Sequence, residues 1–161
     1  IFEINMKASL LIILFFFNLS FLSIDKEKIY NALAGDSYLR IDQLIIELEA
    51  EKPSSINKVY KGALLAKRAY FEKNAVKKIN KFKEGVQLLE SEIGKFPNEI
   101  EYRFLRLCIQ ESCPKILKYN NNITEDSGLI IQNFSKQSSK LKSIITNYSK
   151  NSNSLDNSLL K

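Results

Sequence analysis

The clearest pattern in the chain is a run of apolar residues that recurs every three or four positions after Asn74. Its members are Ala75, Ile79, Phe82, Val86, Leu89, Ile93 and Phe96. This spacing keeps the apolar side chains on one side of an α-helix, whereas a strand would alternate with a period of two. Asn74 suits the N-cap, and Gly94 followed by Pro97 suits the end of the helix. We therefore predict a helix from Asn74 to Gly94, with Phe82 and Leu89 in the core.

The same periodicity predicts four further helices and no strand. They cover residues 36–50, 54–70, 98–113 and 124–148, and the apolar positions expected to face the core are Leu39, Leu44, Ile45, Leu48, Val59, Tyr60, Ala63, Leu64, Tyr70, Ile100, Phe104, Leu107, Cys108, Ile130, Phe134, Leu141, Ile144, Ile145 and Tyr148. Ser54 or Ser55 suits the cap of the second, and Thr124 suits the cap of the last. Short connections such as 52–55 force neighbouring helices to run antiparallel. The predicted fold is all-α, built from packed antiparallel helical hairpins.

The first 24 residues carry a different pattern. Leu10 to Leu22 is an uncharged apolar run that follows Met6-Lys7 and precedes the charged stretch 25–28. This order is typical of a secretory signal peptide, so we interpret 1–23 as that segment, with Met6 as the true start. The alternative is an inner-membrane anchor formed by 8–24, which is at the short end of what spans a bilayer. The first reading predicts an exported protein, periplasmic or secreted.

The rest of the chain divides into two parts. Residues 24–148 hold the helical patterns and form the predicted α-helical domain. Residues 149–161 are nearly all Ser, Asn, Lys and Leu, without periodicity. Such a composition at a chain end favours a disordered tail.

Two of the predicted helices end with similar sequences. Glu-Lys-Pro-Ser at 51–54 and Lys-Phe-Pro-Asn at 95–98 each follow a Leu-containing helix. They resemble the close of a tetratricopeptide (TPR) repeat over residues 36–112, although Pro53 and Pro97 are 44 residues apart whereas the TPR period is about 34. The resemblance implies a TPR-like arrangement of α-hairpins, with a protein-binding groove and no catalysis. As a whole the chain resembles small exported bacterial proteins.

Composition narrows the chemistry. The chain has no His, which excludes a Ser-His-Asp triad, a Cys-His pair and a His-ligated metal site. Only 5 Gly leave little room for a phosphate-binding loop, and 3 Pro with so few Gly disfavour β-sandwiches. We therefore expect no cofactor and no metal. The acidic residues lie on Lys-rich helices, which favours solvation and ion pairing over acid-base catalysis.

Cys108 and Cys113 are the only cysteines. Five positions on a helix turn the two side chains about 140° apart, so a disulfide requires the helix to end between them. Pro114 permits such an ending. Two separate, largely buried thiols are one interpretation, and a disulfide favoured by an exporting compartment is the other.

Half of the 4 arginines lie close together, at 103 and 106, in a chain that otherwise uses Lys. On a helix Glu99, Arg103, Arg106 and Gln110 follow steps of four, three and four, and so form one polar ribbon. One hypothesis makes the ribbon a partner-binding site that presents a guanidinium to a carboxylate or phosphate. The other makes it structural, with Glu99 paired to Arg103 and Arg106 paired to a carboxylate on a neighbouring helix.

The formal net charge is +6, from 24 basic and 18 acidic residues. Lys73, Lys77 and Lys81 share a helix face, which indicates either a solvated surface or a weak contact with anionic lipid headgroups. No aromatic or Arg residues interleave with them, so nucleic acid is not an expected partner. Together these features favour a non-enzymatic, exported protein-binding or scaffold module. The alternatives are a small enzyme that uses carboxylates and Lys, and a membrane-tethered structural protein.

Overall fold

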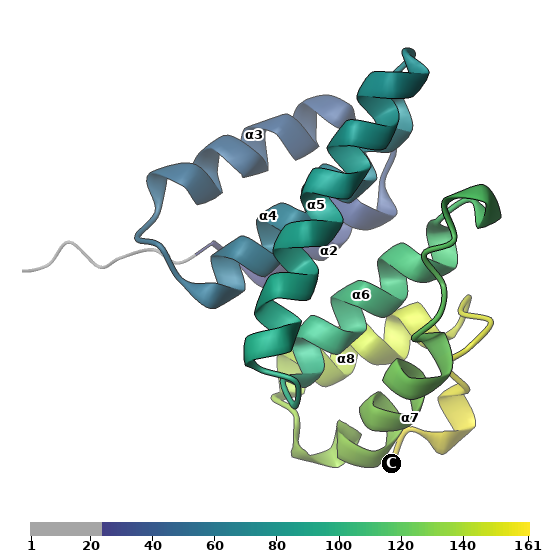
Figure 1. Cartoon of the computed structure of the whole chain (residues 1–161). Helices are drawn as coiled ribbons and strands as arrows, with labels where there is room; N and C mark the ends of the chain where they lie inside the picture. Colours follow the sequence, from purple (N-terminus) through teal and green to yellow (C-terminus); the bar gives the residue numbers. More distant parts are fainter. Residues whose placement is uncertain (1–23) are drawn as a thin grey trace, which may run out of the picture.

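The computed structural model describes residues 24–161, which form seven α-helices and no β-strand (Figure 1). The helices are α2 (Lys26–Ala34), α3 (Tyr38–Ala50), α4 (Ser55–Arg68), α5 (Ala75–Lys95), α6 (Ile100–Ser112), α7 (Ile123–Asn133) and α8 (Ser139–Ser149). Single 3-10 turns are η2 (Ala69–Phe71), η3 (Lys115–Leu117), η4 (Phe134–Lys136) and η5 (Asn157–Leu159). The predicted all-α fold is confirmed. The predicted signal peptide lies outside the described residues, as does the predicted anchor except for Ile24.

Two of the predicted helix caps are confirmed. The Ser54 hydroxyl accepts a hydrogen bond from the backbone N–H of Asn57, and the Asn74 side chain accepts one from that of Lys77. Each cap supplies a partner for a backbone group that the first turn leaves without one. The predicted end of the second of these helices is too early, because Gly94 lies inside α5, which continues to Lys95.

The prediction of one helix over 124–148 is wrong, since the structure divides this range into α7 and α8. The chain leaves the first helix through η4, and the Ser138 hydroxyl then accepts a hydrogen bond from the backbone N–H of Leu141 to start the second. Phe134 and Leu141 are seven residues apart, a spacing that two helical turns would also produce. The apolar pattern alone therefore did not reveal the break.

The helices enclose two hydrophobic cores, and α6 lies between them (Figure 1). The first core packs α2, α3, α4 and α5 against Tyr102, Leu105 and Ile109 of α6. The second packs α7, α8 and the C-terminal segment against the opposite side of α6. Phe82 and Leu89 are buried in the first core, as predicted. Because α6 is covered on both sides, nine of its residues are buried.

Several residues of the predicted apolar stripes are instead exposed. Leu39, Tyr70, Ile79 and Phe96 all lie at or near helix ends. Tyr70, Ile79 and Phe96 follow the helix period but lie beyond the reach of a covering helix. Leu39 instead lies on the side of α3 opposite the buried Ile41, Leu44 and Leu48. The apolar period indicates which side of a helix faces the core, but not how far along that side a neighbouring helix extends.

The two helices of the α4–α5 hairpin approach each other closely at Gly62 and Gly85. A Cβ atom added at Gly85 would lie 2.5 Å from both the backbone nitrogen of Ala66 and the backbone oxygen of Gly62. A Cβ at Gly62 would lie 2.7 Å from the backbone oxygen of Gly85. Real Cβ atoms do not come so close to backbone atoms, so this crossing requires glycine on both helices.

The C-terminal segment, predicted to be disordered, is instead packed on α6. Leu155 is only 1% exposed and belongs to the second core. The carboxylate of Glu111 accepts hydrogen bonds from the backbone N–H groups of Asn153 and Ser154, at 3.1 and 2.9 Å. It also accepts hydrogen bonds from the hydroxyls of Ser152 and Tyr148. The carboxylate that orders the tail lies on α6, about forty residues upstream. The local composition of the tail therefore gave no sign that the tail would be ordered.

We predict that Gly85→Ala lowers the free energy of unfolding by about 1–3 kcal/mol, because the added methyl group forces the α4–α5 hairpin apart. Gly94→Ala is the matched control in the same helix, since nothing lies within 4 Å of its added Cβ. It should stabilise the protein by about 0.5–1 kcal/mol through helix propensity. Urea titration of both variants measures the difference, and equal stabilities would contradict the close crossing.

We also predict a pH-dependent contribution from Glu111. Its hydrogen bonds hold its pKa below the usual value of 4.5 although burial opposes this. Its stabilising effect should therefore be present above pH 4.5 and be lost as the pH falls through the lower, folded-state pKa. Glu111→Gln should cost about 1–3 kcal/mol at neutral pH, and the gap to wild type should close in acid.

The control for this measurement is Glu84→Gln. Glu84 is exposed on α5 and has no hydrogen bond or ion pair with another side chain of the described range. The free energy of unfolding of Glu84→Gln should equal that of the wild-type protein at every pH. A gap between wild type and Glu111→Gln that stays constant from neutral to acidic pH would show that the carboxylate charge is not what holds the tail.

Candidate functional site

The predicted polar ribbon on α6 is not a free surface. Arg103, Arg106 and Gln110 are buried, while Glu99 is exposed at the start of the helix. These four residues therefore do not form the exposed partner-binding site of the first hypothesis, because α7 covers the side of α6 on which the arginines lie. The structural alternative was also only partly right, since Arg103 pairs with residues of α7, and no pair with Glu99 is formed.

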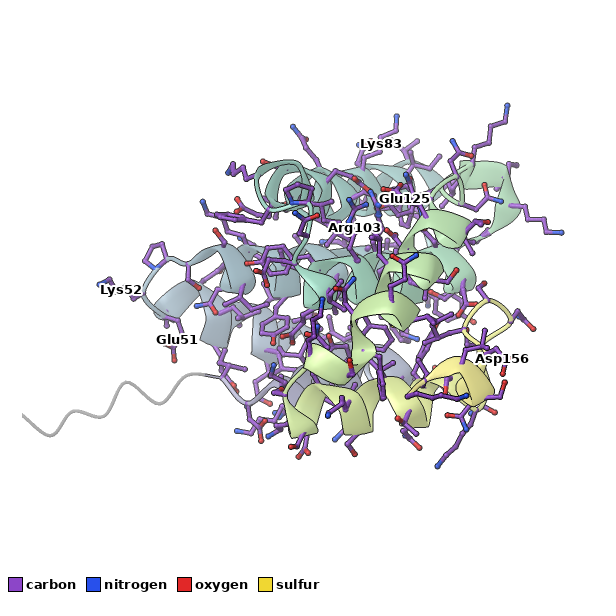
Figure 2. All side chains as sticks on the ribbon, turned by 90° about the horizontal axis from the view of Figure 1, so that it is seen from below. Glu51, Lys52, Lys83, Arg103, Glu125 and Asp156 are labelled. Atoms are coloured by element: carbon purple, nitrogen blue, oxygen red, sulfur yellow. The ribbon has the colours of Figure 1, made fainter. Side chains whose placement is uncertain are left out.

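The arginines converge on Asp126, in the first turn of α7, which is fully buried. Arg106 binds both carboxylate oxygens of Asp126, with Nε and Nη2 each at 2.7 Å. Nη1 of Arg103 lies 3.2 Å from Asp126 Oδ1 and 3.1 Å from the carboxylate of Glu125 (Figure 2). Nη1 of Arg106 also donates to Glu90 on α5 at 2.9 Å. The planar guanidinium matches the carboxylate at two points, which Lys cannot do.

This ion cluster joins three helices and contains two positive and three negative groups. Two guanidinium groups face the carboxylates of Asp126, Glu125 and Glu90, and the Tyr119 hydroxyl donates to Glu90 at 2.5 Å. Carboxylates at the start of α7 also complement the positive end of that helix. The cluster is therefore a structural clamp, and it leaves no guanidinium facing solvent for a ligand.

The two cysteines are free thiols in the structure, so the disulfide interpretation is not supported. Cys108 packs into the second core, whereas Cys113 packs against the first. The helix does end at Ser112, as a disulfide would require, but the two side chains pack against different cores. The interpretation as separate thiols fits this arrangement.

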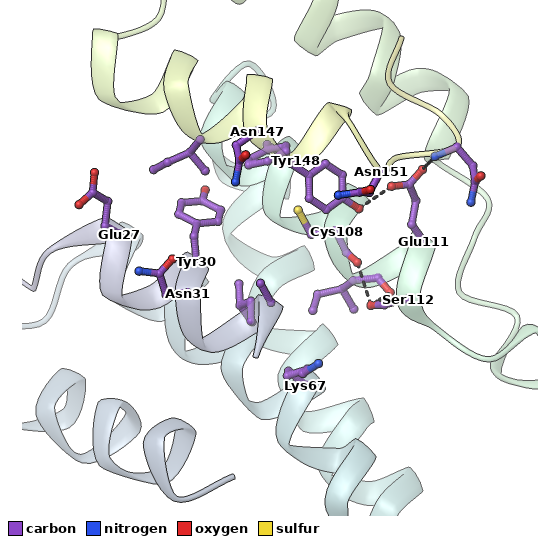
Figure 3. Close-up of a pocket in the computed structure, with 16 residues that line it drawn as sticks. Glu27, Tyr30, Asn31, Lys67, Cys108, Glu111, Ser112, Asn147, Tyr148 and Asn151 are labelled. Carbon is purple, nitrogen blue, oxygen red and sulfur yellow. Dashed lines mark hydrogen bonds between the residues drawn. The ribbon is translucent and has the colours of Figure 1, made fainter. Parts of the chain in front are cut away.

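A cleft of about 460 Å³ lies between α2 and α8, and α6 forms its floor (Figure 3). Its aromatic part is a chain of three rings. The ring centroids of Tyr30 and Phe104 are 5.4 Å apart, and those of Phe104 and Tyr148 are 5.2 Å apart in an edge-to-face arrangement. Leu33, Ala34, Ile109, Ile144 and the Cys108 side chain complete the apolar lining. Pockets of this size and apolar character are typical of binding sites.

The rim of the cleft is polar and mostly uncharged. It carries four exposed carboxamides, contributed by Asn31, Asn147, Asn151 and Asn153. Two charged side chains also lie at the rim, Glu27 toward the start of α2 and Lys67 beyond its end (Figure 3). Each carboxamide offers both donors and an acceptor, so the rim can hydrogen-bond a neutral polar group in either direction.

The titratable groups inside the cleft are held in fixed protonation states. Burial raises the pKa of the Cys108 thiol and of the Tyr30 and Tyr148 hydroxyls, so all three stay protonated at neutral pH. Glu111, whose pKa is lowered, stays ionised and is occupied by the C-terminal segment. The Tyr30 hydroxyl has no hydrogen-bond partner among the described residues. The lining therefore suits binding better than proton transfer.

Sequence reasoning did not find this cleft. Tyr30 and Asn31 belong to α2, a helix that the apolar pattern did not single out, and the asparagines near the C-terminus looked like a low-complexity tail. The only cleft residue that was considered as a site is Cys108. The signal available was the recurrence of Asn at 147, 151 and 153, around the end of the last predicted helix.

Comparison with family models, with curated proteins and with solved structures finds no match for this chain. Within residues 24–161 no helix is both long and apolar enough to cross a bilayer. The same range contains no group of three or more acidic or Cys side chains arranged to hold a metal ion.

We predict that the clamp on α6 is required for stability. Asp126→Asn leaves two buried guanidinium groups without their shared counter-charge and should lower the free energy of unfolding by about 3–5 kcal/mol. Arg106→Lys keeps the charge but loses the two-point contact, and should cost about 1–3 kcal/mol. The matched control is Arg40→Lys, because within residues 24–161 the guanidinium of Arg40 makes one exposed hydrogen bond, to Gln43. Thermal melts that leave Arg106→Lys unchanged would contradict the structural role.

Proposed function

We propose that the protein is a protein-binding or scaffold module whose cleft between α2 and α8 receives an apolar side chain from an extended segment of a partner protein. The observation that carries this proposal is the composition of the cleft, which combines an aromatic floor with a rim of exposed carboxamides. An aromatic floor gains free energy by covering an apolar side chain. A neutral polar rim is suited to the uncharged backbone on either side of it.

The rim supports a peptide as the occupant. A peptide group presents one N–H and one C=O, and a carboxamide can bond to both at once. Asn31 lies on one wall of the cleft and Asn147 on the other, so a strand of backbone between them has a carboxamide on each side (Figure 3).

The enzyme alternative draws less support from the cleft. A carboxylate that transfers protons needs a pKa near the working pH, whereas the pKa of Glu111 is lowered and its hydrogen bonds go to Tyr148 and the C-terminal segment. The Cys108 thiol is a poor nucleophile, since burial raises its pKa. The export predicted from residues 1–23 would make the partner another envelope or secreted protein.

We predict that a random peptide library selected against residues 24–161 yields sequences that share one apolar anchor residue. Ala34→Phe should weaken the binding of the selected peptides by about tenfold or more, because the new ring enters the cleft that Ala34 lines. Isothermal titration with one selected peptide measures the change. Both cores lie within 24–161, so this part of the chain contains every packing contact described above.

The matched control is Ala50→Phe. Ala34 and Ala50 are both exposed and each is the last residue of a helix, but Ala50 ends α3, which does not line the cleft. The control should change affinity by less than about twofold. Selected peptides with no common anchor, or equal losses in the two variants, would rule out the cleft as the binding site.

A further inference from the structure

The positive charge of the chain is concentrated at one end of the molecule. Residues 67–83, here called the cationic tip, contain seven Lys or Arg residues and one acidic residue, Glu72, so that their formal net charge is +6. The whole chain also has a formal net charge of +6, so the remaining residues balance overall. The tip comprises the last two residues of α4, η2, the turn that follows it and the first half of α5, and it projects from the end of the α4–α5 hairpin (Figure 1).

The lysines of the tip are available to an external partner. Arg68 is engaged by Asp42 at 2.8 Å and by Glu72 at 3.3 Å, so its single positive charge is shared between two carboxylates. Within residues 24–161 no carboxylate lies within salt-bridge distance of the five tip lysines on and before α5. These are Lys73, Lys77, Lys78, Lys81 and Lys83. Lys83 extends outward from the molecule (Figure 2).

Apolar side chains are exposed among these lysines. Tyr70 is 67% exposed, Val76 is 66% exposed and Ile79 is 39% exposed. Tyr70 packs edge-on against Phe71, and the Lys67 ammonium lies 5.8 Å from the centroid of the Tyr70 ring. Neither core covers these three side chains. An exposed apolar patch with a cationic border is a feature of surfaces that bind at a membrane interface.

We propose that the cationic tip docks on an anionic lipid surface, with Tyr70 and Val76 entering the headgroup region and the surrounding lysines bound to lipid phosphates. The lysines provide long-range attraction to a negatively charged leaflet. Tyrosine places an apolar ring in the interface while its hydroxyl stays hydrated. The partner fits both properties of the tip, because a bilayer surface offers negative charge and an apolar layer directly below it.

A nucleic acid fits the tip less well. It would satisfy the lysines, but Val76 and Ile79 are aliphatic and cannot stack on bases. The single arginine of the tip, Arg68, is already held by two carboxylates and is not free to read a base edge. The exposed aliphatic residues therefore favour a lipid surface as the partner. Substituting them distinguishes binding to lipid from binding to nucleic acid.

The test is sedimentation of residues 24–161 with vesicles of phosphatidylcholine alone and of phosphatidylcholine mixed with phosphatidylglycerol. This range is used because the apolar run at 10–22 would itself partition into vesicles. We expect binding to the anionic vesicles only, and a decrease as salt is raised. The variant Lys73→Gln/Lys77→Gln/Lys81→Gln should lose roughly tenfold or more in affinity.

The matched control is Lys136→Gln/Lys150→Gln/Lys161→Gln, which removes the same charge from exposed positions near α8 and the C-terminus. It should change affinity by less than about threefold. Equal losses in the two triple variants would overturn the proposal, since binding would then follow net charge alone. Absence of binding to anionic vesicles, with a wild-type melting curve, would also overturn it.

A second variant separates lipid from nucleic acid. Tyr70→Ser/Val76→Ser should weaken vesicle binding by about fivefold or more and leave any binding to a DNA oligonucleotide unchanged. Tighter binding to DNA than to vesicles at the same salt, insensitive to this variant, would replace the lipid surface with nucleic acid.

The chain contains no Trp, so Tyr70→Trp introduces a single fluorescent reporter. Its emission should shift to the blue on anionic vesicles, whereas Leu159→Trp, on the opposite part of the molecule, should not shift. Leu159 suits this control because it is also exposed, at 51%. A shift at Leu159→Trp and none at Tyr70→Trp would place the lipid contact away from the tip.

Discussion

The central constraint on this fold is that α6 is covered on two sides. One side packs against α4 and α5, the other against α7 and α8, and the two buried arginines between them therefore need counter-charges inside the protein. Asp126 meets this requirement by receiving both Arg103 and Arg106. The ion cluster is thus a consequence of the position of α6. It also fixes the angle at which α7 meets α6, since a two-point guanidinium contact tolerates little rotation.

The same arrangement produces the cleft. α2 belongs to the first core and α8 to the second, and they flank the part of α6 that carries Phe104 and Cys108 at the base of the cleft. Glu111, at the end of that strip, anchors the C-terminal segment and so sets the position of Asn153 at the rim. Each wall of the cleft therefore belongs to a packed core and is rigid. Rigid walls reduce the conformational entropy that the protein loses when a partner segment binds.

The sequence predicted what depends on neighbouring residues. The helix capped by Asn74 and the burial of Phe82 and Leu89 follow from a spacing that is readable within one segment. The partners of Arg106 were not readable, because Asp126 and Glu90 lie on other helices and nothing in their own segments marks them as buried. The cleft depends on Tyr30 and Tyr148, which lie near opposite ends of the helical domain. The order of the tail depends on Glu111 in the same way. Apolar periodicity therefore predicted which segments form helices, but not which residues of distant segments contact each other.

The position of the arginine clamp also matters while the chain is being made. α6 leaves the ribosome before α7, so during that interval Arg103 and Arg106 face water instead of Asp126. A guanidinium is soluble in water, and the side of α6 that later becomes interior is then partly polar. Apolar residues at the same two positions would extend the exposed stripe of Ile100, Phe104 and Leu107 and favour association between nascent chains. The buried charges therefore keep a half-synthesised protein from presenting an uninterrupted apolar surface.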